Sequence, residues 1–274
     1  MRGRRTLAVA ATLGGVAVVA GAVALYGGWY DVSATDQHLG PTYWLLETGM
    51  RESLERQARW LKEPPLDDPA LIARGLAHVR AHCVQCHGAP GVAPSAFALG
   101  LTPLPENLVH VARTRRPAEI FQAVKYGLKM TGMPAWEFRL PDDDLWAVVA
   151  FVRQLPTLSP AQYVELPASA PPTVLLGGLP AVADPARGKT AILQYACVTC
   201  HVVPGVVGAN APVGPPLDRL AERTYLAGRL LNTEENLVRW IREPKAISPN
   251  SAMPDLGVTE RDARDMAAYL RALR

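Results

Sequence analysis

Cysteine is rare in this chain of 274 residues, and none lies outside two short motifs. An excess of one charge is also lacking, because 28 Lys and Arg residues against 25 Asp and Glu give a net charge of only +3. That balance is too mild to indicate a nucleic-acid partner, and no nucleic-acid-binding motif is present. No βαβ pattern is visible either, which argues against a thioredoxin-like redox dithiol.

The four cysteines form the pattern C-x-x-C-H twice. The first motif contains Cys83 and Cys86 followed by His87, and the second contains Cys197 and Cys200 followed by His201. This pattern is typical of c-type haem attachment, in which two thiols form thioethers with the haem vinyl groups and the histidine reaches the iron. The doubled motif predicts two covalent haem c groups, each with one iron.

Zinc binding and disulfide formation are the two alternatives to haem attachment. Cys and His are zinc ligands, but zinc sites usually draw their ligands from two short clusters, and here 114 residues separate the motifs. Structural disulfides occur in exported proteins, but they leave the histidine after each pair unexplained. Both alternatives therefore account for less of the pattern than haem does.

The N-terminus predicts a membrane anchor. Three arginines precede an uncharged stretch from Thr6 to Tyr30, and its apolar centre, Leu7 to Tyr26, has the length of a bilayer-spanning helix. The arginines predict a cytoplasmic N-terminus, and Trp29 and Tyr30 follow where an aromatic belt belongs. The alternative is a signal peptide cleaved near Ala22-Val23-Ala24. In either case the two cysteine motifs are predicted outside the cytoplasm.

Beyond the anchor, residues 41–62 show apolar positions at helical spacing, and Pro64-Pro65 is expected to end that helix. The helix is either packed on the first cysteine-bearing domain or is a docking element for a membrane partner. Six prolines in residues 156–183 predict a semi-extended linker. The predicted organisation is a membrane anchor at 1–30, a juxtamembrane helix segment at 31–68, domain 1 at 69–155, a proline-rich linker at 156–183 and domain 2 at 184–274.

The two domains align with each other, which indicates an internal duplication. Ala73-Arg74-Gly75 precedes the first motif and Ala186-Arg187-Gly188 precedes the second. Each domain ends in an amphipathic stretch with an aromatic residue, at 145–152 and 266–270. The glycines allow the last helix to cross the first closely, because they have no Cβ. The apolar stripes are interpreted as core.

Each domain resembles a class I cytochrome c. The resemblance rests on the early glycine, the C-x-x-C-H motif, a later Met-Pro and the closing aromatic helix, and it covers about 180 residues. The resemblance implies an all-α fold of two tandem class I cytochrome c domains after a single N-terminal transmembrane helix. The whole layout is similar to membrane-anchored dihaem cytochromes c of bacterial respiratory chains.

The resemblance also implies a methionine as the second axial iron ligand, which raises the reduction potential. Met133 is the candidate in domain 1, because its Gly-Met-Pro context matches the family, and Met130 is the competitor. Met253 is the candidate in domain 2, whereas Met266 is interpreted as core. The predicted metal ligands are therefore His87 with Met133 and His201 with Met253.

Further residues are predicted to surround these ligands. In the family the iron-binding histidine donates to a proline carbonyl in a Gly-Pro-x-Leu loop, which points to Pro215, and Pro103 is the weaker counterpart in domain 1. A bis-histidine haem is the less favoured alternative, and His78 is expected on the surface. Arginines 113, 115 and 116 are interpreted as a solvated cluster, a propionate site or a steering patch.

The predicted function is electron transfer without catalysis of its own, as a single-pass inner-membrane subunit with its haem domains in the periplasm. The expected partner is a haem–copper terminal oxidase or a membrane dehydrogenase, with the oxidase favoured, and a soluble cytochrome or copper protein is a further partner. The alternative is a dihaem enzyme such as a peroxidase or a thiosulfate-oxidising cytochrome. That alternative needs an iron position that opens or a further cysteine, and the sequence offers a methionine in each domain and no fifth cysteine.

Overall fold

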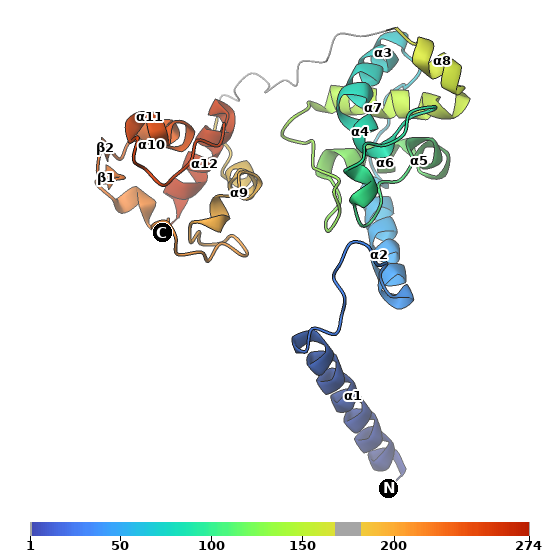
Figure 1. Cartoon of the computed structure of the whole chain (residues 1–274), viewed down its shortest axis with the longest axis horizontal. Helices are drawn as coiled ribbons and strands as arrows, with labels where there is room; N and C mark the ends of the chain where they lie inside the picture. Colours follow the sequence, from blue (N-terminus) through green and yellow to red (C-terminus); the bar gives the residue numbers. More distant parts are fainter. Residues whose placement is uncertain (1, 168–181, 274) are drawn as a thin grey trace. The chain divides into compact units, whose positions relative to one another are not determined.

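The computed structural model describes residues 2–167 and 182–273. The described chain is mostly helical and divides into two compact units (Figure 1). Among described residues, the first unit contains 2–135 and 146–167, and the second contains 136–145 and 182–273. Residues 168–181 of the predicted linker lie outside the described residues, and the domain boundaries at 69, 155 and 184 stay predictions.

The helices of the first unit include a π-helical turn, η1, which ends at the first cysteine of the first motif. Their bounds are α1 Arg2–Tyr26, α2 Gly40–Ala58, α3 Pro69–His78, η1 Val79–Cys83, α4 Val84–His87, η2 Ala98–Gly100, α5 Leu108–Thr114, α6 Pro117–Tyr126, α7 Asp142–Gln154, η3 Leu155–Thr157 and α8 Pro160–Glu165.

The second unit adds a short antiparallel hairpin to its helices. Its elements are α9 Pro185–Gln194, η4 Cys197–Thr199, η5 Leu220–Glu222, β1 Tyr225–Leu226, β2 Leu230–Leu231, α10 Glu234–Arg242, α11 Pro244–Ile247 and α12 Glu260–Ala272.

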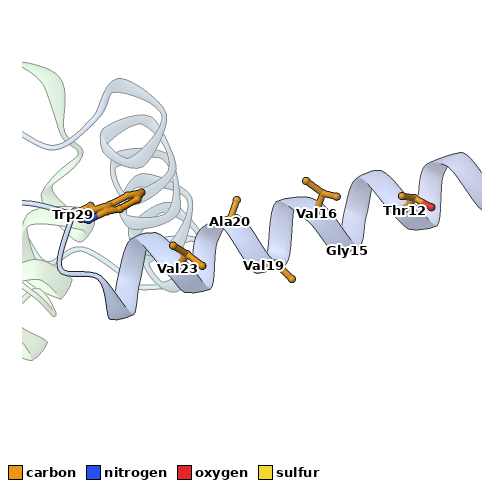
Figure 2. A pocket seen from close by; sticks show the side chains of 7 residues that line it. All are labelled: Thr12, Gly15, Val16, Val19, Ala20, Val23 and Trp29. Atoms are coloured by element: carbon orange, nitrogen blue, oxygen red, sulfur yellow. The ribbon is translucent and has the colours of Figure 1, made fainter.

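Helix α1 consists mainly of an apolar stretch that the protein leaves exposed. Residues Thr6–Tyr26 form the one described helix that is long and apolar enough to cross a membrane, and none of that stretch is buried by protein. Its Thr12 hydroxyl donates to the Ala8 carbonyl at 3.0 Å, which satisfies the polar group internally as a lipid environment requires. Figure 2 shows an open, largely apolar hollow along one side of α1 that ends at Trp29. This hollow contains none of the cysteine motif residues.

In the first unit, α3 crosses α7 at the predicted glycine. A Cβ built on Gly75 would lie 1.9 Å from the Ala147 carbonyl oxygen, so only glycine fits this contact. The rings of Phe121 on α6 and Trp146 on α7 stack with centroids 4.3 Å apart. The predicted apolar stripe at 145–152 is buried, as expected for core.

The second unit repeats this crossing between α9 and α12. A Cβ on Gly188 would lie 1.9 Å from the Asp265 carbonyl oxygen. Beside it, the Arg187 guanidinium pairs with the buried Asp265 carboxylate, with Nε and Oδ2 2.9 Å apart. A buried carboxylate needs such a partner, because an unpaired charge there is strongly destabilising. Met266 is 1% exposed, which confirms that it belongs to the core.

We expect Gly75→Ala and Gly188→Ala each to destabilise the unit that contains the substitution. The added methyl would force two helices apart, at a cost of about 2–3 kcal/mol in the free energy of unfolding. Gly49→Ala on α2 is the matched control, because no atom lies within 4 Å of its added Cβ. That helical substitution should stabilise by about 0.5–1 kcal/mol. Urea titrations followed by circular dichroism check this, and equal midpoints for all three variants would contradict it.

The juxtamembrane helix α2 divides into two halves. Leu54 and Ala58 are buried, and α2 lies beside α6 (Figure 1). The Glu63 side chain accepts the Ala118 N–H at 3.0 Å and so caps α6. Tyr43, Trp44 and their neighbours at the start of α2 remain exposed. The predicted packing on the first domain therefore describes the second half of α2 only.

Part of the proline-rich segment packs instead of forming an extended linker. Residues 160–165 form α8, whose Tyr163 side chain is buried against Phe151. The Arg80 guanidinium donates to the carbonyls of Tyr163 and Leu166 at 3.0 and 3.1 Å. Prolines are compatible with a first helical turn, so Pro160 starts α8 rather than preventing it.

His78 contradicts its predicted surface position. Its side chain is 3% exposed, and Gly75 to His78 are four consecutive buried residues. The end of α3 is thus enclosed on all sides, whereas helical periodicity predicts one buried face. The His78 and His82 rings lie with centroids 6.1 Å apart.

Candidate functional site

The first cysteine motif continues directly from α3. Cys83 ends the π-helical turn η1, and Cys86 and His87 lie on α4. Residues three apart on a helical segment face the same side, so both thiols point to one surface. Burial, with the neighbouring Cys86 thiol, raises the pKa of Cys83 to about 12. Cys83 is therefore a neutral thiol at neutral pH.

The second motif follows α9 through a left-handed residue, Ala196, which has φ of +55°. Cys197 begins the short turn η4, and the Cys197 carbonyl accepts the N–H groups of Cys200 and His201 at 3.2 and 3.0 Å. This turn brings the backbone of the whole motif into a single compact loop. Burial raises the pKa of Cys197.

The geometry disfavours both alternatives to haem. All four cysteines are free, so neither motif forms a disulfide. Within residues 2–167 and 182–273, no three His, Cys, Asp or Glu side chains come together as a metal-ion site. Zinc in a structural site takes four such ligands. Each motif by itself therefore holds a pair of free thiols and does not gather the four ligands of a structural zinc site.

His87 is oriented by a carbonyl that the sequence did not predict. Its Nδ1 lies 2.6 Å from the Glu106 carbonyl oxygen. A carbonyl can only accept, so Nδ1 carries the hydrogen and Nε2 is left with a lone pair for a metal. The assignment of Pro103 is therefore wrong. The first unit lacks the Gly-Pro of the family loop, and its loop presents Glu106 instead.

His201 is oriented as predicted. Its Nδ1 lies 2.8 Å from the Pro215 carbonyl oxygen, which again leaves Nε2 available. Gly214 packs against the imidazole, and a Cβ there would lie 2.5 Å from His201 Cε1. The Gly-Pro pair thus serves two purposes, because the glycine admits the ring and the proline carbonyl fixes its orientation.

The first methionine loop is held by a hydroxyl group. The Met133 N–H donates to Thr131 Oγ1 at 3.0 Å, and Thr131 Oγ1 donates to the Leu128 carbonyl at 2.8 Å. Met133 is half-buried, whereas Met130 is 78% exposed. Gly127, with φ of +65°, lies directly against this loop, since a Cβ there would be 2.8 Å from the Met133 carbonyl oxygen.

The second methionine loop uses the same device. The Met253 N–H donates to Ser251 Oγ at 3.1 Å, and Met253 is half-buried. In both loops a hydroxyl residue stands two positions before Met-Pro. Sequence reasoning missed Thr131 and Ser251, although aligning the two Met-Pro segments reveals the shared pattern of Ser or Thr, any residue, Met and Pro. No sequence pattern marks Glu106, because its hydrogen bond to His87 uses the backbone carbonyl and not the side chain.

Two of the three arginines in the cluster at residues 113–116 form ion pairs within the first unit. Arg115 lies 3.6 Å from Glu47 on α2, and Arg116 Nε lies 2.6 Å from Glu119 on α6. These contacts favour the interpretation of a structural surface cluster.

The paired thiols and oriented imidazoles fit haem c. Two thiols on one face can form thioethers with one porphyrin edge, and an imidazole with Nδ1 already hydrogen-bonded presents Nε2 to iron. The residues present therefore match the donor set of a covalent haem in each unit.

Comparisons with known proteins agree with this fit. Residues 70–152 match the family "Cytochrome C oxidase, cbb3-type, subunit III", and residues 185–274 match the family "Cytochrome c". A cytochrome c oxidase subunit 2 of Alkalihalophilus pseudofirmus is 35% identical over 89 residues, which are 32% of this chain and 25% of that protein. A cytochrome c oxidase subunit 2 of Bacillus sp. strain PS3 is 32% identical over 100 residues, which are 35% of this chain and 28% of that protein.

The chain spans only about a quarter of the length of these curated relatives. No solved structure matches it. The two family matches cover both cysteine motifs, both oriented histidines and both methionine loops. The predicted all-α class is also confirmed by the helical structure. Residues 70–152 and 185–274 are therefore two domains of the cytochrome c type, a domain type that implies covalently bound haem c, and one apolar helix precedes them.

Proposed function

We propose that this chain is an electron-transfer subunit with two six-coordinate c-type haems. Cys83 and Cys86 would bind one haem, and Cys197 and Cys200 the other. The observation that carries the proposal is the repeated ligand arrangement. In each unit the motif histidine has Nδ1 hydrogen-bonded to a carbonyl, and a hydroxyl holds the loop of a half-buried methionine.

Haem iron bound there would supply a one-electron redox couple. His87 and His201 would bind iron through Nε2, and the Glu106 and Pro215 carbonyls would keep each ring in the binding tautomer. Met133 and Met253 would close the sixth position, which favours electron transfer over oxygen or peroxide chemistry. The protein holds these ligands in place in both redox states and performs no bond-breaking step itself.

The partner we propose is a respiratory terminal oxidase. Support comes from the family match named for an oxidase subunit and from two relatives named as oxidase subunits. We further propose that α1 stays in the bacterial inner membrane and holds both haem domains on the periplasmic side. The arginines in the first turns of α1 support this orientation, since positive residues stay in the cytoplasm. A tether raises the effective concentration of the domains beside a fixed partner.

Purification in mild detergent tests the partner. The full chain should copurify with haem–copper oxidase subunits, and reduced chain should be oxidised by that complex in the presence of oxygen. Copurification with a dehydrogenase and no oxidase would overturn the oxidase assignment.

Intact mass of the mature protein tests the anchor, because a chain that begins near Leu25 in the soluble fraction would show that α1 is removed.

We expect Thr131→Val and Ser251→Ala to loosen the methionine loops without loss of haem. Each change removes a hydrogen bond worth about 1 kcal/mol, which should raise the affinity of ferric protein for added imidazole roughly fivefold in one domain. Thr114→Val is the control, because its exposed hydroxyl donates only to the His110 carbonyl. Spectral titration measures the affinity. Equal affinity in all variants would mean that these hydroxyls do not support the ligand loops.

A further inference from the structure

The start of α2 exposes large apolar side chains that the rest of the helix does not. Tyr43, Trp44 and Leu45 are 58%, 66% and 64% exposed, and Leu46 is 38% exposed. Successive helical residues are rotated by about 100°, so these four point to all sides of the helix. With the exposed Leu39 at the N-cap they form what we call the apolar tip. Apolar patches of this kind mark an interaction surface.

The charged residues of α2 are separated from the apolar ones along the helix axis, and not between two faces of the helix. Residues 37–46 contain no Asp, Glu, Lys or Arg, whereas residues 47–56 contain five charged residues. An amphipathic helix that lies flat on a partner separates apolar and charged residues between two faces. Here the separation runs along the axis, and it fits an environment whose polarity changes along the axis, such as the surface of a bilayer.

The dimensions of the apolar tip match the lipid headgroup region. Tyr43 to Leu46 covers about 6 Å along the axis at about 1.5 Å per residue. The polar layer on each side of the bilayer core is about 5–8 Å thick. Trp and Tyr are the residues enriched at that depth. Leu39 offers the first-turn amides no side-chain acceptor, and lipid phosphate or ester oxygens can accept from such amides.

The chain also keeps the apolar tip close to the membrane. Only residues 27–39 separate α1 from α2, so the connection can reach at most about 45 Å when fully extended. This connection is held by two side-chain contacts. Thr102 Oγ1, from the body of the first unit, donates to the Ala34 carbonyl at 2.6 Å. Tyr30 Oη and His38 Nδ1 lie 3.0 Å apart within the same connection.

We propose that the apolar tip inserts end-on into the lipid headgroup region of the bilayer that α1 crosses. This rests on the proposed retention of α1. Because the other half of α2 packs on α6 through Leu54 and Ala58, the helix then sets the height of the first cytochrome domain above the lipid. Gln122 Nε2 on α6 also donates to the Gln57 carbonyl at 3.3 Å, a second contact that fixes the C-terminal half of α2 to the first unit. Helix α2 is thus a rigid spacer.

Photocrosslinking in bacterial membranes tests the proposal on the full chain. Trp44 is replaced by p-benzoylphenylalanine, and the membranes are irradiated. Mass spectrometry of the purified haem protein then shows whether the mass of a phospholipid has been added. Trp60→p-benzoylphenylalanine is the matched control, because Trp60 is 86% exposed just beyond the other end of α2. Trp29→p-benzoylphenylalanine, just after the end of α1, tests whether the anchor itself lies beside lipid. Unchanged haem absorbance shows that each variant folds.

We expect lipid adducts at positions 44 and 29 and none at position 60. A lipid adduct at 29 with none at 44 would overturn the spacer and leave the anchor intact. An adduct at 44 to another protein or to a second copy of this chain would overturn it in favour of a protein interface. Absence of lipid adducts at both 44 and 29 would contradict the proposed membrane anchor, and with it the proposed spacer.

Discussion

Cys86→Ala and Cys200→Ala should each reduce the covalent haem content from two per chain to one. The expected effect is large because stable attachment uses both thiols of a motif. The two motifs lie in separate units, so we expect the loss in one unit to leave the other unaffected. Haem retained after acid–acetone extraction, measured per chain, gives the result. Each variant should keep the ligand spectrum of the unaltered domain.

The double variant Cys86→Ala/Cys200→Ala is the internal control for this result, and neither of its domains should retain covalent haem. Thr199→Ala, inside the second motif but not a thioether site, should leave two. A single haem in the unaltered protein would contradict the duplicated site. Stoichiometric zinc without haem would overturn the cofactor assignment in both domains.

Met133→His and Met253→His should each lower the reduction potential of one haem and leave the other unchanged. An imidazole stabilises ferric iron more than a thioether does, so the ligand change acts directly on the metal. Spectroelectrochemical titration should resolve two couples, one shifted downward. The near-infrared band of thioether-bound ferric haem should fall to half in each variant.

Met130→Ala separates the two candidates in the first domain. Met130 is 78% exposed and has φ of +60°, so its removal should leave both couples and the near-infrared band unchanged. Loss of the band in Met130→Ala with its retention in Met133→Ala would make Met130 the ligand instead.

Local chemistry explains why so much could be predicted from the sequence. Haem attachment requires two thiols and an imidazole at a set spacing, so the C-x-x-C-H pattern predicts the site without knowledge of distant contacts. The length of the apolar stretch likewise predicts α1. Gly188 could be assigned to a helix crossing because the duplication places it nine residues before its motif, much as Gly75 lies eight residues before the first motif. The close approach of Asp265 confirms this assignment.

Tertiary structure alone decided the features that depend on residues far apart in the chain. The acceptor for His87 is the Glu106 carbonyl rather than Pro103, because a backbone carbonyl exists at every residue and only the loop path selects one. Arg80 holds α8 by donating to carbonyls more than 80 positions away, and a proline count cannot foresee such a contact. His78 is buried and the apolar tip of α2 is exposed for the same reason. Helical periodicity predicts one apolar face, but the neighbouring elements determine how much of each helix they cover.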